Sequence, residues 1–222
     1  MKLFIDSADI EEIKQAVDTG IVDGVTTNPS LLAKSKIARQ NKLSVHDYYE
    51  KICALVGGDV SAEVIATDYS AMVEEGRELA NISPNIVVKV PMTQAGIKAI
   101  GTLKEAGIRT NCTLIFSVSQ ALLAAKAGAF YISPFIGRLD DAGQIGNGMQ
   151  LVEQICDVVG YYGFTTQVLA ASIRSLQHVE QCAEVGADVA TCPYGVLEAM
   201  FKHPLTDTGL KKFLSDYAEA KD

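Results

Sequence analysis

Short apolar runs rich in β-branched residues alternate along this chain with longer segments in which apolar residues recur every three or four positions. Runs of the first kind are typical of strands buried on both faces, and segments of the second kind are typical of amphipathic helices. The pattern predicts strands over Lys2–Ile5, Gly24–Thr27, Ser61–Ala66, Ile86–Val90, Arg109–Ile115, Phe130–Ser133, Thr166–Ala171 and Asp188–Thr191. It predicts helices over Ile10–Val17, Val45–Leu55, Tyr69–Leu79, Thr93–Ala106, Ser117–Ala127, Met149–Tyr162, Ser175–Glu184, Val196–Lys202 and Thr208–Ala220.

Each predicted strand is followed by a helix, and no linker interrupts the alternation. Gly20, Gly107, Gly128 and Gly186 separate a helix from the next strand, where a left-handed cap is needed. Eight such units predict a single (β/α)₈ TIM barrel over residues 1–222 with an extra C-terminal helix. A doubly wound sheet is the alternative, but the chain offers no evident switch point for it.

Composition and charge narrow the range of partners. The 222 residues carry 19 Lys and Arg against 27 Asp and Glu, which gives a formal net charge of −8. A net-repulsive surface argues against nucleic acid or an anionic membrane as a partner, although a local basic pocket for a small phosphate is compatible with it. The N-terminus has no signal-peptide pattern, and no apolar run is long enough to span a membrane.

The cysteines and histidines give no metal-binding pattern. Five cysteines without a CxxC pair indicate reduced thiols and a cytoplasmic protein. His46, His178 and His203 lie far apart in sequence, so no metal site is expected. We expect all three to be solvated or capping residues away from the catalytic rim of the barrel.

Chemistry in such a barrel lies at the carboxyl ends of the strands. Nearly every predicted strand ends in a polar or ionisable group, and together these groups favour a hydroxylated, anionic ligand: Asp6, Thr26, Asn28, Glu63, Lys89, Asn111, Thr113, Ser133, Arg138, Ser172 and Arg174.

Lys89 is the most informative of these residues because it interrupts an otherwise apolar strand. Burial disfavours an ammonium ion, and a buried free amine can attack a carbonyl to form a Schiff base. Glu63 and Asp6 also end apolar strands, and two carboxylates beside an amine can divide acid and base roles. The alternatives are an ion pair between Glu63 and Lys89, and a helix-capping role for Asp6.

Two arginines follow the sixth and seventh strands. Two guanidinium groups close together suit a phosphate monoester, so Arg138 and Arg174, with the Ser172 hydroxyl, predict a phosphate site. Taken singly, each arginine would more often form a surface ion pair.

These residues lie in segments that resemble the transaldolase family, in the short-chain branch that also contains fructose-6-phosphate aldolase. The resemblance spans essentially the whole chain and rests on Phe4-Ile5-Asp6-Ser7-Ala8, Gly24-Val25-Thr26-Thr27-Asn28-Pro29-Ser30, Val87-Val88-Lys89-Val90-Pro91, Asn111-Cys112-Thr113-Leu114-Ile115-Phe116-Ser117, Ser133-Pro134-Phe135-Ile136-Gly137-Arg138 and Ala171-Ser172-Ile173-Arg174.

The resemblance implies a role for each matched residue. Lys89 is expected to form the Schiff base, Asp6 to handle the hydroxyl proton, and Glu63 with Thr113 to hold a catalytic water. The remaining positions are expected to bind the substrate through Asn28, Asn111, Ser133 and Phe135 and its phosphate through Arg138, Ser172 and Arg174. No cofactor is implied, because the lysine itself supplies the electron sink.

The resemblance also implies a transaldolase rather than an aldolase. Aldolase-type members carry Gln where this chain has Glu63 and Tyr where it has Phe135, and Arg174 in place of Lys favours the same choice. The expected reaction moves a dihydroxyacetone unit from sedoheptulose 7-phosphate to glyceraldehyde 3-phosphate. The alternatives are an aldolase that releases free dihydroxyacetone and a sugar-phosphate-binding barrel without turnover. The branch further implies a homo-oligomer, expected to be a decamer of two pentamers, in which the C-terminal helix crosses to a neighbour.

Overall fold

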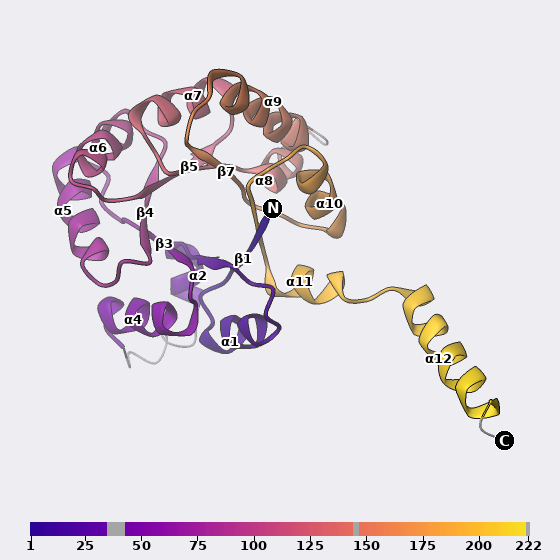
Figure 1. The fold of residues 1–222 in the computed structure, drawn as a ribbon. Helices are drawn as coiled ribbons and strands as arrows, with labels where there is room; N and C mark the ends of the chain where they lie inside the picture. The colour runs from indigo at the N-terminus through magenta and orange to yellow at the C-terminus, as the bar shows by residue number, and fades with distance from the viewer. Residues whose placement is uncertain (35–42, 144–146, 221–222) are drawn as a thin grey trace.

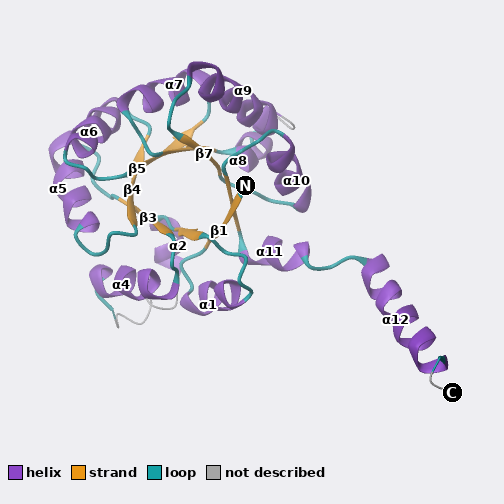
Figure 2. Cartoon of the chain, in the orientation of Figure 1, coloured by secondary structure: helices purple, strands orange, loops and turns teal. Residues whose placement is uncertain are grey.

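Eight parallel strands close into a barrel in the computed structural model of the chain, which describes residues 1–34, 43–143 and 147–220 (Figure 2). The strands are β1 (Lys2–Asp6), β2 (Gly24–Thr26), β3 (Asp59–Glu63), β4 (Ile86–Pro91), β5 (Thr110–Ile115), β6 (Tyr131–Pro134), β7 (Gln167–Ala170) and β8 (Val189–Cys192). The barrel closes where β1 pairs with β8, with Phe4 beside Thr191. The predicted (β/α)₈ fold is therefore confirmed.

Helices surround the barrel on its outer side (Figure 1). The helices of the described residues are α1 (Ile10–Asp18), α2 (Pro29–Lys34), α4 (Val45–Leu55), α5 (Tyr69–Ala80), α6 (Gln94–Glu105), α7 (Val118–Ala127), α8 (Ile136–Asp141), α9 (Asn147–Tyr162), α10 (Leu176–Glu184), α11 (Tyr194–Met200) and α12 (Pro204–Glu219), and all but α12 lie against the barrel. The four glycines predicted to end helices all have positive φ, between 75° at Gly107 and 89° at Gly128.

The third strand differs from its prediction over Ser61–Ala66. β3 begins at Asp59 and ends at Glu63, although Val64 still donates its N–H to the Lys89 carbonyl. The Glu75 carboxylate then accepts the N–H groups of Ile65 and Ala66. A side chain of α5 thus takes the donors that a longer strand would need, and this ends the ladder.

Two short helices were not predicted. α2 and α8 have six residues each, too few for a helical period to show in the sequence. A signal for α2 was nevertheless present, since Asn28 accepts a hydrogen bond from the Leu31 N–H and is followed by Pro29 at the first helical position. The first residues of α8 carry no such signal, because Phe135 makes no side-chain capping bond.

The side chains that point into the barrel are apolar in its interior and mostly polar at the carboxyl ends of the strands. Residues two apart on a strand face the same side, so Phe4 and Asp6 share the interior face, as do Val87 and Lys89. The buried interior cluster consists of Phe4, Val87, Tyr131, Phe135, Leu169, Ala171 and Val189. Two residues after Phe4, Val87 and Val189, the polar side chains of Asp6, Lys89 and Thr191 follow at the carboxyl ends of their strands.

A polar cluster closes the opposite end of the barrel. Arg109 Nη1 donates to Asp59 Oδ1 at 2.6 Å, and the Tyr131 hydroxyl donates to Asp59 Oδ2 at 2.8 Å. The Arg109 guanidinium also stacks over the Phe130 ring. These contacts join β3, β5 and β6 at the ends where the strands begin, and we call them the floor cluster.

The last helix projects away from the barrel (Figure 1). α12 leaves several large apolar side chains exposed, among them Leu205, Phe213 and Leu214. It begins at Pro204, earlier than the predicted Thr208, because His203 caps it by accepting the Leu205 N–H. Within the described residues, no helix is long and apolar enough to cross a membrane.

Candidate active site

A cavity of about 230 Å³ opens at the carboxyl ends of the strands. Of the predicted site residues, those lining it are Asp6, Asn28, Lys89, Ser133, Phe135, Arg138, Ser172 and Arg174. The barrel thus brings eight of the eleven to one pocket, and the other three, Glu63, Asn111 and Thr113, come from β3 and β5.

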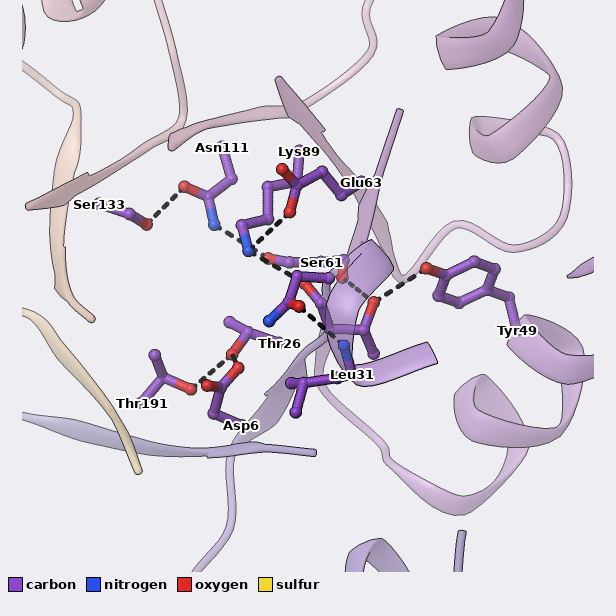
Figure 3. A network of polar contacts seen from close by, with 12 residues as sticks. Asp6, Thr26, Leu31, Tyr49, Ser61, Glu63, Lys89, Asn111, Ser133 and Thr191 are labelled. Atoms are coloured by element: carbon purple, nitrogen blue, oxygen red, sulfur yellow. Dashed lines mark hydrogen bonds and ion pairs between the residues drawn. The ribbon is translucent and has the colours of Figure 1, made fainter. Parts of the chain in front are cut away.

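Lys89 lies at the centre of a buried polar network (Figure 3). Its side chain extends from β4, and the residue is only 5% exposed. The Nζ atom lies 3.0 Å from Glu63 Oε2 and donates to the Thr27 carbonyl, also at 3.0 Å. Glu63 and Lys89 are paired in register on neighbouring strands, so the sheet itself sets this ion pair.

An ion pair with Lys89 was the predicted alternative to a catalytic role for Glu63, and this ion pair is present. It does not exclude chemistry, because a carboxylate at this distance can also accept a proton from the amine. Lys89 contacts both Glu63 and the pocket that contains Asp6.

Asp6 ends β1 on the far side of the pocket. Its Oδ1 accepts a hydrogen bond from the Thr26 hydroxyl at 2.7 Å, and Thr26 in turn contacts the Thr191 hydroxyl. Burial raises the pKa of Asp6, while the positive charge of Lys89, the Thr26 hydrogen bond and the two arginines oppose the shift. A carboxyl group with a raised pKa is suited to exchange protons. The helix-capping alternative is wrong, since Asp9 caps α1.

Amide and hydroxyl groups from β3, β5 and β6 form a second part of the network. Asn111 Nδ2 donates to the Ser61 hydroxyl, and the Ser133 hydroxyl donates to Asn111 Oδ1 at 2.7 Å. Both ends of the Asn111 amide therefore have a hydroxyl partner. Thr113 is also buried, and its hydroxyl has no hydrogen-bond partner among the described residues. A buried hydroxyl of this kind is stabilised when a water or substrate meets it.

Tyr49 supports the carbonyl that holds Lys89. Its hydroxyl lies 2.9 Å from the Thr27 hydroxyl, which also donates to the Ser61 carbonyl. Burial raises the pKa of Tyr49 to about 12, so the phenol stays protonated. Sequence reasoning missed this contact because an aromatic on a helix gives no signal that it reaches a strand end.

The other end of the pocket is cationic. Arg138 lies over the Phe135 ring, with 4.8 Å between the guanidinium carbon and the ring centre. Arg174 Nη2 lies 3.0 Å from Asp141 Oδ2 at the exposed surface. Ser172 precedes this arginine with a φ of 59°, which is uncommon for a residue with a side chain. Arg138, Ser172 and Arg174 thus line the same pocket, and two guanidinium groups with a hydroxyl suit an anionic group.

Sequence reasoning did not single out two polar residues of the pocket lining or a histidine that contacts one of the lining residues. Thr191 on β8 and Lys34 at the end of α2 both line the pocket, and neither stands out from its sequence context. His178, expected away from the rim, has a side chain only 16% exposed, and its Nδ1 accepts the Arg174 N–H. The expectation was wrong because α10 starts directly after the arginine and its first turn folds back onto it.

One group of side chains has metal-ligand spacing in the described residues. His46, Asp47 and Glu50 bring their ligand atoms within 4.8 Å of one another on the exposed face of α4. Exposed acidic groups are common without an ion, and this group lies outside the pocket described above.

Comparison with known proteins identifies the family of the chain. The sequence pattern of the family described as Transaldolase/Fructose-6-phosphate aldolase matches residues 3–222. A "Probable transaldolase" of Parabacteroides distasonis is 59% identical over 217 residues, which are 98% of each chain. The chain belongs to this family. A second family member, "Probable transaldolase" of Porphyromonas gingivalis, is 58% identical over 222 residues, 100% of this chain and 99% of its own.

Solved structures agree on the fold of this family member. Thiamine phosphate pyrophosphorylase from Pyrococcus furiosus has a TM-score of 0.56 and 14% identity, covering 88% of this chain and 87% of its own. At this identity the likeness shows the barrel alone.

Proposed function

We propose that the protein is a transaldolase that works through a Schiff base on Lys89. It transfers a dihydroxyacetone unit from sedoheptulose 7-phosphate to glyceraldehyde 3-phosphate, giving erythrose 4-phosphate and fructose 6-phosphate in the pentose phosphate pathway. The observation that carries the proposal is a buried amine 3.0 Å from a carboxylate, in a pocket with a second carboxyl group and two guanidinium groups.

The covalent step begins with proton transfer from Lys89 to Glu63. The neutral Nζ attacks the ketone carbon of the donor, and the resulting carbinolamine loses water to give an imine. Glu63 and the Thr113 hydroxyl hold and protonate that leaving water. The name of the two relatives, "Probable transaldolase", supports the same chemistry.

Carbon–carbon bond cleavage follows at Asp6. Asp6 takes the proton from the hydroxyl next to the breaking bond, and the bonding electrons pass into the imine to give an enamine. The aldose phosphate leaves, and the enamine attacks the aldehyde carbon of the acceptor with the same steps reversed. Asn28, Asn111 and Ser133 hold the hydroxyl groups of the three-carbon fragment, while Arg138, Ser172 and Arg174 bind the phosphate of donor and acceptor.

The first test is borohydride trapping with fructose 6-phosphate, followed by peptide mass mapping and an assay for free dihydroxyacetone. We expect a reduced three-carbon adduct on Lys89 and turnover only when an aldose phosphate acceptor is present. Lys89→Met should abolish the adduct. A wild-type protein that forms no adduct on Lys89 would refute the Schiff-base mechanism and favour a binding barrel without turnover.

The second candidate is an aldolase that releases dihydroxyacetone, and Phe135 argues against it. The Phe135 ring packs between Arg138 and Phe116 and carries no hydroxyl to protonate the enamine. The double variant Glu63→Gln with Phe135→Tyr should therefore shift activity from transfer towards release. A double variant that only loses activity would contradict this account of the choice between the two reactions.

We also propose that the protein works in the cytoplasm as a homo-oligomer, with a decamer as the predicted size. Its five cysteines are free, as a reducing compartment allows. The exposed apolar side chains of α12 support an assembly, because a surface of this kind is stabilised when another subunit covers it. Light scattering on the full chain measures the subunit number directly.

A further inference from the structure

The loop that carries Ser172 and Arg174 is held in a conformation that the chain does not favour by itself. Ser172 has a φ of 59°, in the left-handed region that residues with a side chain enter only at an energetic cost. The phosphate end of the pocket therefore depends on neighbouring groups that stabilise this loop.

Helix α8 supplies the first of these supports. The N–H groups of Ile136 and Gly137 donate to the carbonyls of Ala171 and Ser172. A Cβ on Gly137 would lie 2.6 Å from Arg174 Cγ, so the missing side chain lets the arginine lie against the helix. These contacts fix the loop up to Ser172 and the stem of the arginine.

His178 supplies the second support, at the backbone of Arg174 itself. Its Nδ1 accepts the Arg174 N–H at 3.2 Å, and its Nε2 lies 3.2 Å from Asp140 Oδ2 on α8. The ring therefore joins the arginine loop to α8 through both nitrogens. Because Nδ1 acts as an acceptor, the ring proton must lie on Nε2, where Asp140 accepts it.

We propose that His178 is a positioning residue for the phosphate end of the substrate. It acts through Arg174, keeping this arginine in the lining of the pocket while its exposed guanidinium pairs with Asp141. The proposal rests on the transaldolase function proposed above, and it adds that His178 supports binding of the phosphate and not the chemistry at Lys89.

The test uses paired substitutions that separate the two ring nitrogens. Asn carries an acceptor oxygen near the position of Nδ1, whereas the Gln amide reaches the position of Nε2. Calorimetric titration with inorganic phosphate should show an affinity within about twofold of wild type for His178→Asn and a loss of about tenfold for His178→Gln. His46→Gln is the matched control, because this histidine is 63% exposed on α4 and outside the pocket.

Kinetics give the second readout. His178→Gln should raise KM for fructose 6-phosphate about tenfold, with the effect on KM and not on kcat. Borohydride trapping of dihydroxyacetone, which has no phosphate, should proceed at the wild-type rate. A general loss of structure would slow this trapping as well, so the comparison distinguishes positioning from damage. His178→Ala, which has no acceptor, replaces the Gln variant if circular dichroism shows that Gln disturbs the fold.

Equal phosphate affinity in His178→Gln and wild type would overturn the proposal. So would a loss in His178→Asn as large as that in His178→Gln, because the Nδ1 acceptor would then be irrelevant. If wild type forms no adduct on Lys89, the proposed function fails, but the phosphate titration still decides the role of His178.

Discussion

The pair formed by Lys89 and Glu63 allows a quantitative prediction about stability. Lys89 is 5% exposed, and its Nζ lies 3.0 Å from Glu63 Oε2. We consider three variants, Lys89→Met, Glu63→Gln and the double substitution. Each single change leaves one charge without its partner, and the double change removes both charges.

The magnitude follows from the distance. Two unit charges 3.0 Å apart attract by about 5.5 kcal/mol at an effective dielectric constant of roughly 20. Desolvation of both ions offsets this attraction, so the pair as a whole adds little to the free energy of unfolding. We expect each single variant to lose about 3 kcal/mol and the double variant less than about 1 kcal/mol, a non-additivity of about 5 kcal/mol.

Urea unfolding at neutral pH and one fixed protein concentration measures these free energies, since assembly would make them depend on concentration. The borohydride assay runs in parallel and should show no adduct in either variant that lacks Lys89. Additive effects of the two single substitutions, within about 1 kcal/mol, would refute the reasoning, because the two charges would then not stabilise one another in the folded protein.

Three further predictions concern other parts of the barrel. Burial raises the pKa of Asp6 above 3.8, so its ionised form is disfavoured on folding and the stability of wild type should fall as pH rises through the raised pKa. Asp6→Asn should lack this pH dependence and should be inactive. Urea unfolding midpoints of both proteins from about pH 4 to about pH 8 test this. A difference between the two midpoints that stays the same at every pH would contradict the prediction. Gly137→Ala should weaken inorganic phosphate binding at least about tenfold in calorimetry, because its Cβ would lie 2.3 Å from the Ser172 carbonyl oxygen. Unchanged affinity would mean that the loop has room to shift. Tyr131→Phe should lower the free energy of unfolding by about 1–2 kcal/mol, because it leaves Asp59 short of one hydrogen bond, and it should leave kcat unchanged; a loss of turnover without a loss of stability would contradict this.

Much of the fold and of the pocket was predictable, because the signal lay in single positions that break an apolar run. Lys89 in β4 and Asp6 at the end of β1 interrupt such runs, and a parallel barrel brings strand ends together whatever the loops do. The end of β3 was not predictable, because it depends on Glu75, which lies on the following helix.

The contacts of Tyr49 and His178, which sequence reasoning missed, depend on the orientation of the helices that carry them. Tyr49 reaches Thr27 and His178 reaches Arg174 because of how α4 and α10 are rotated about their axes. The amphipathic pattern indicates which face of each helix is buried, but it does not indicate which group at a strand end a given side chain contacts. The glycines that end helices, in contrast, reflect a local property of the backbone, and all four were predicted.

The floor cluster has a consequence for how the substrate specificity of this barrel can change. Asp59, Arg109 and Tyr131 join β3, β5 and β6 where these strands begin, and Glu63, Thr113 and Ser133 lie further along the same strands. The positions of these strands are therefore fixed where the strands begin, independently of the side chains at their carboxyl ends. Substitutions at the carboxyl ends of the strands can alter substrate choice without disturbing the arrangement of the strands. New specificities can therefore evolve by changes at that end of the barrel alone.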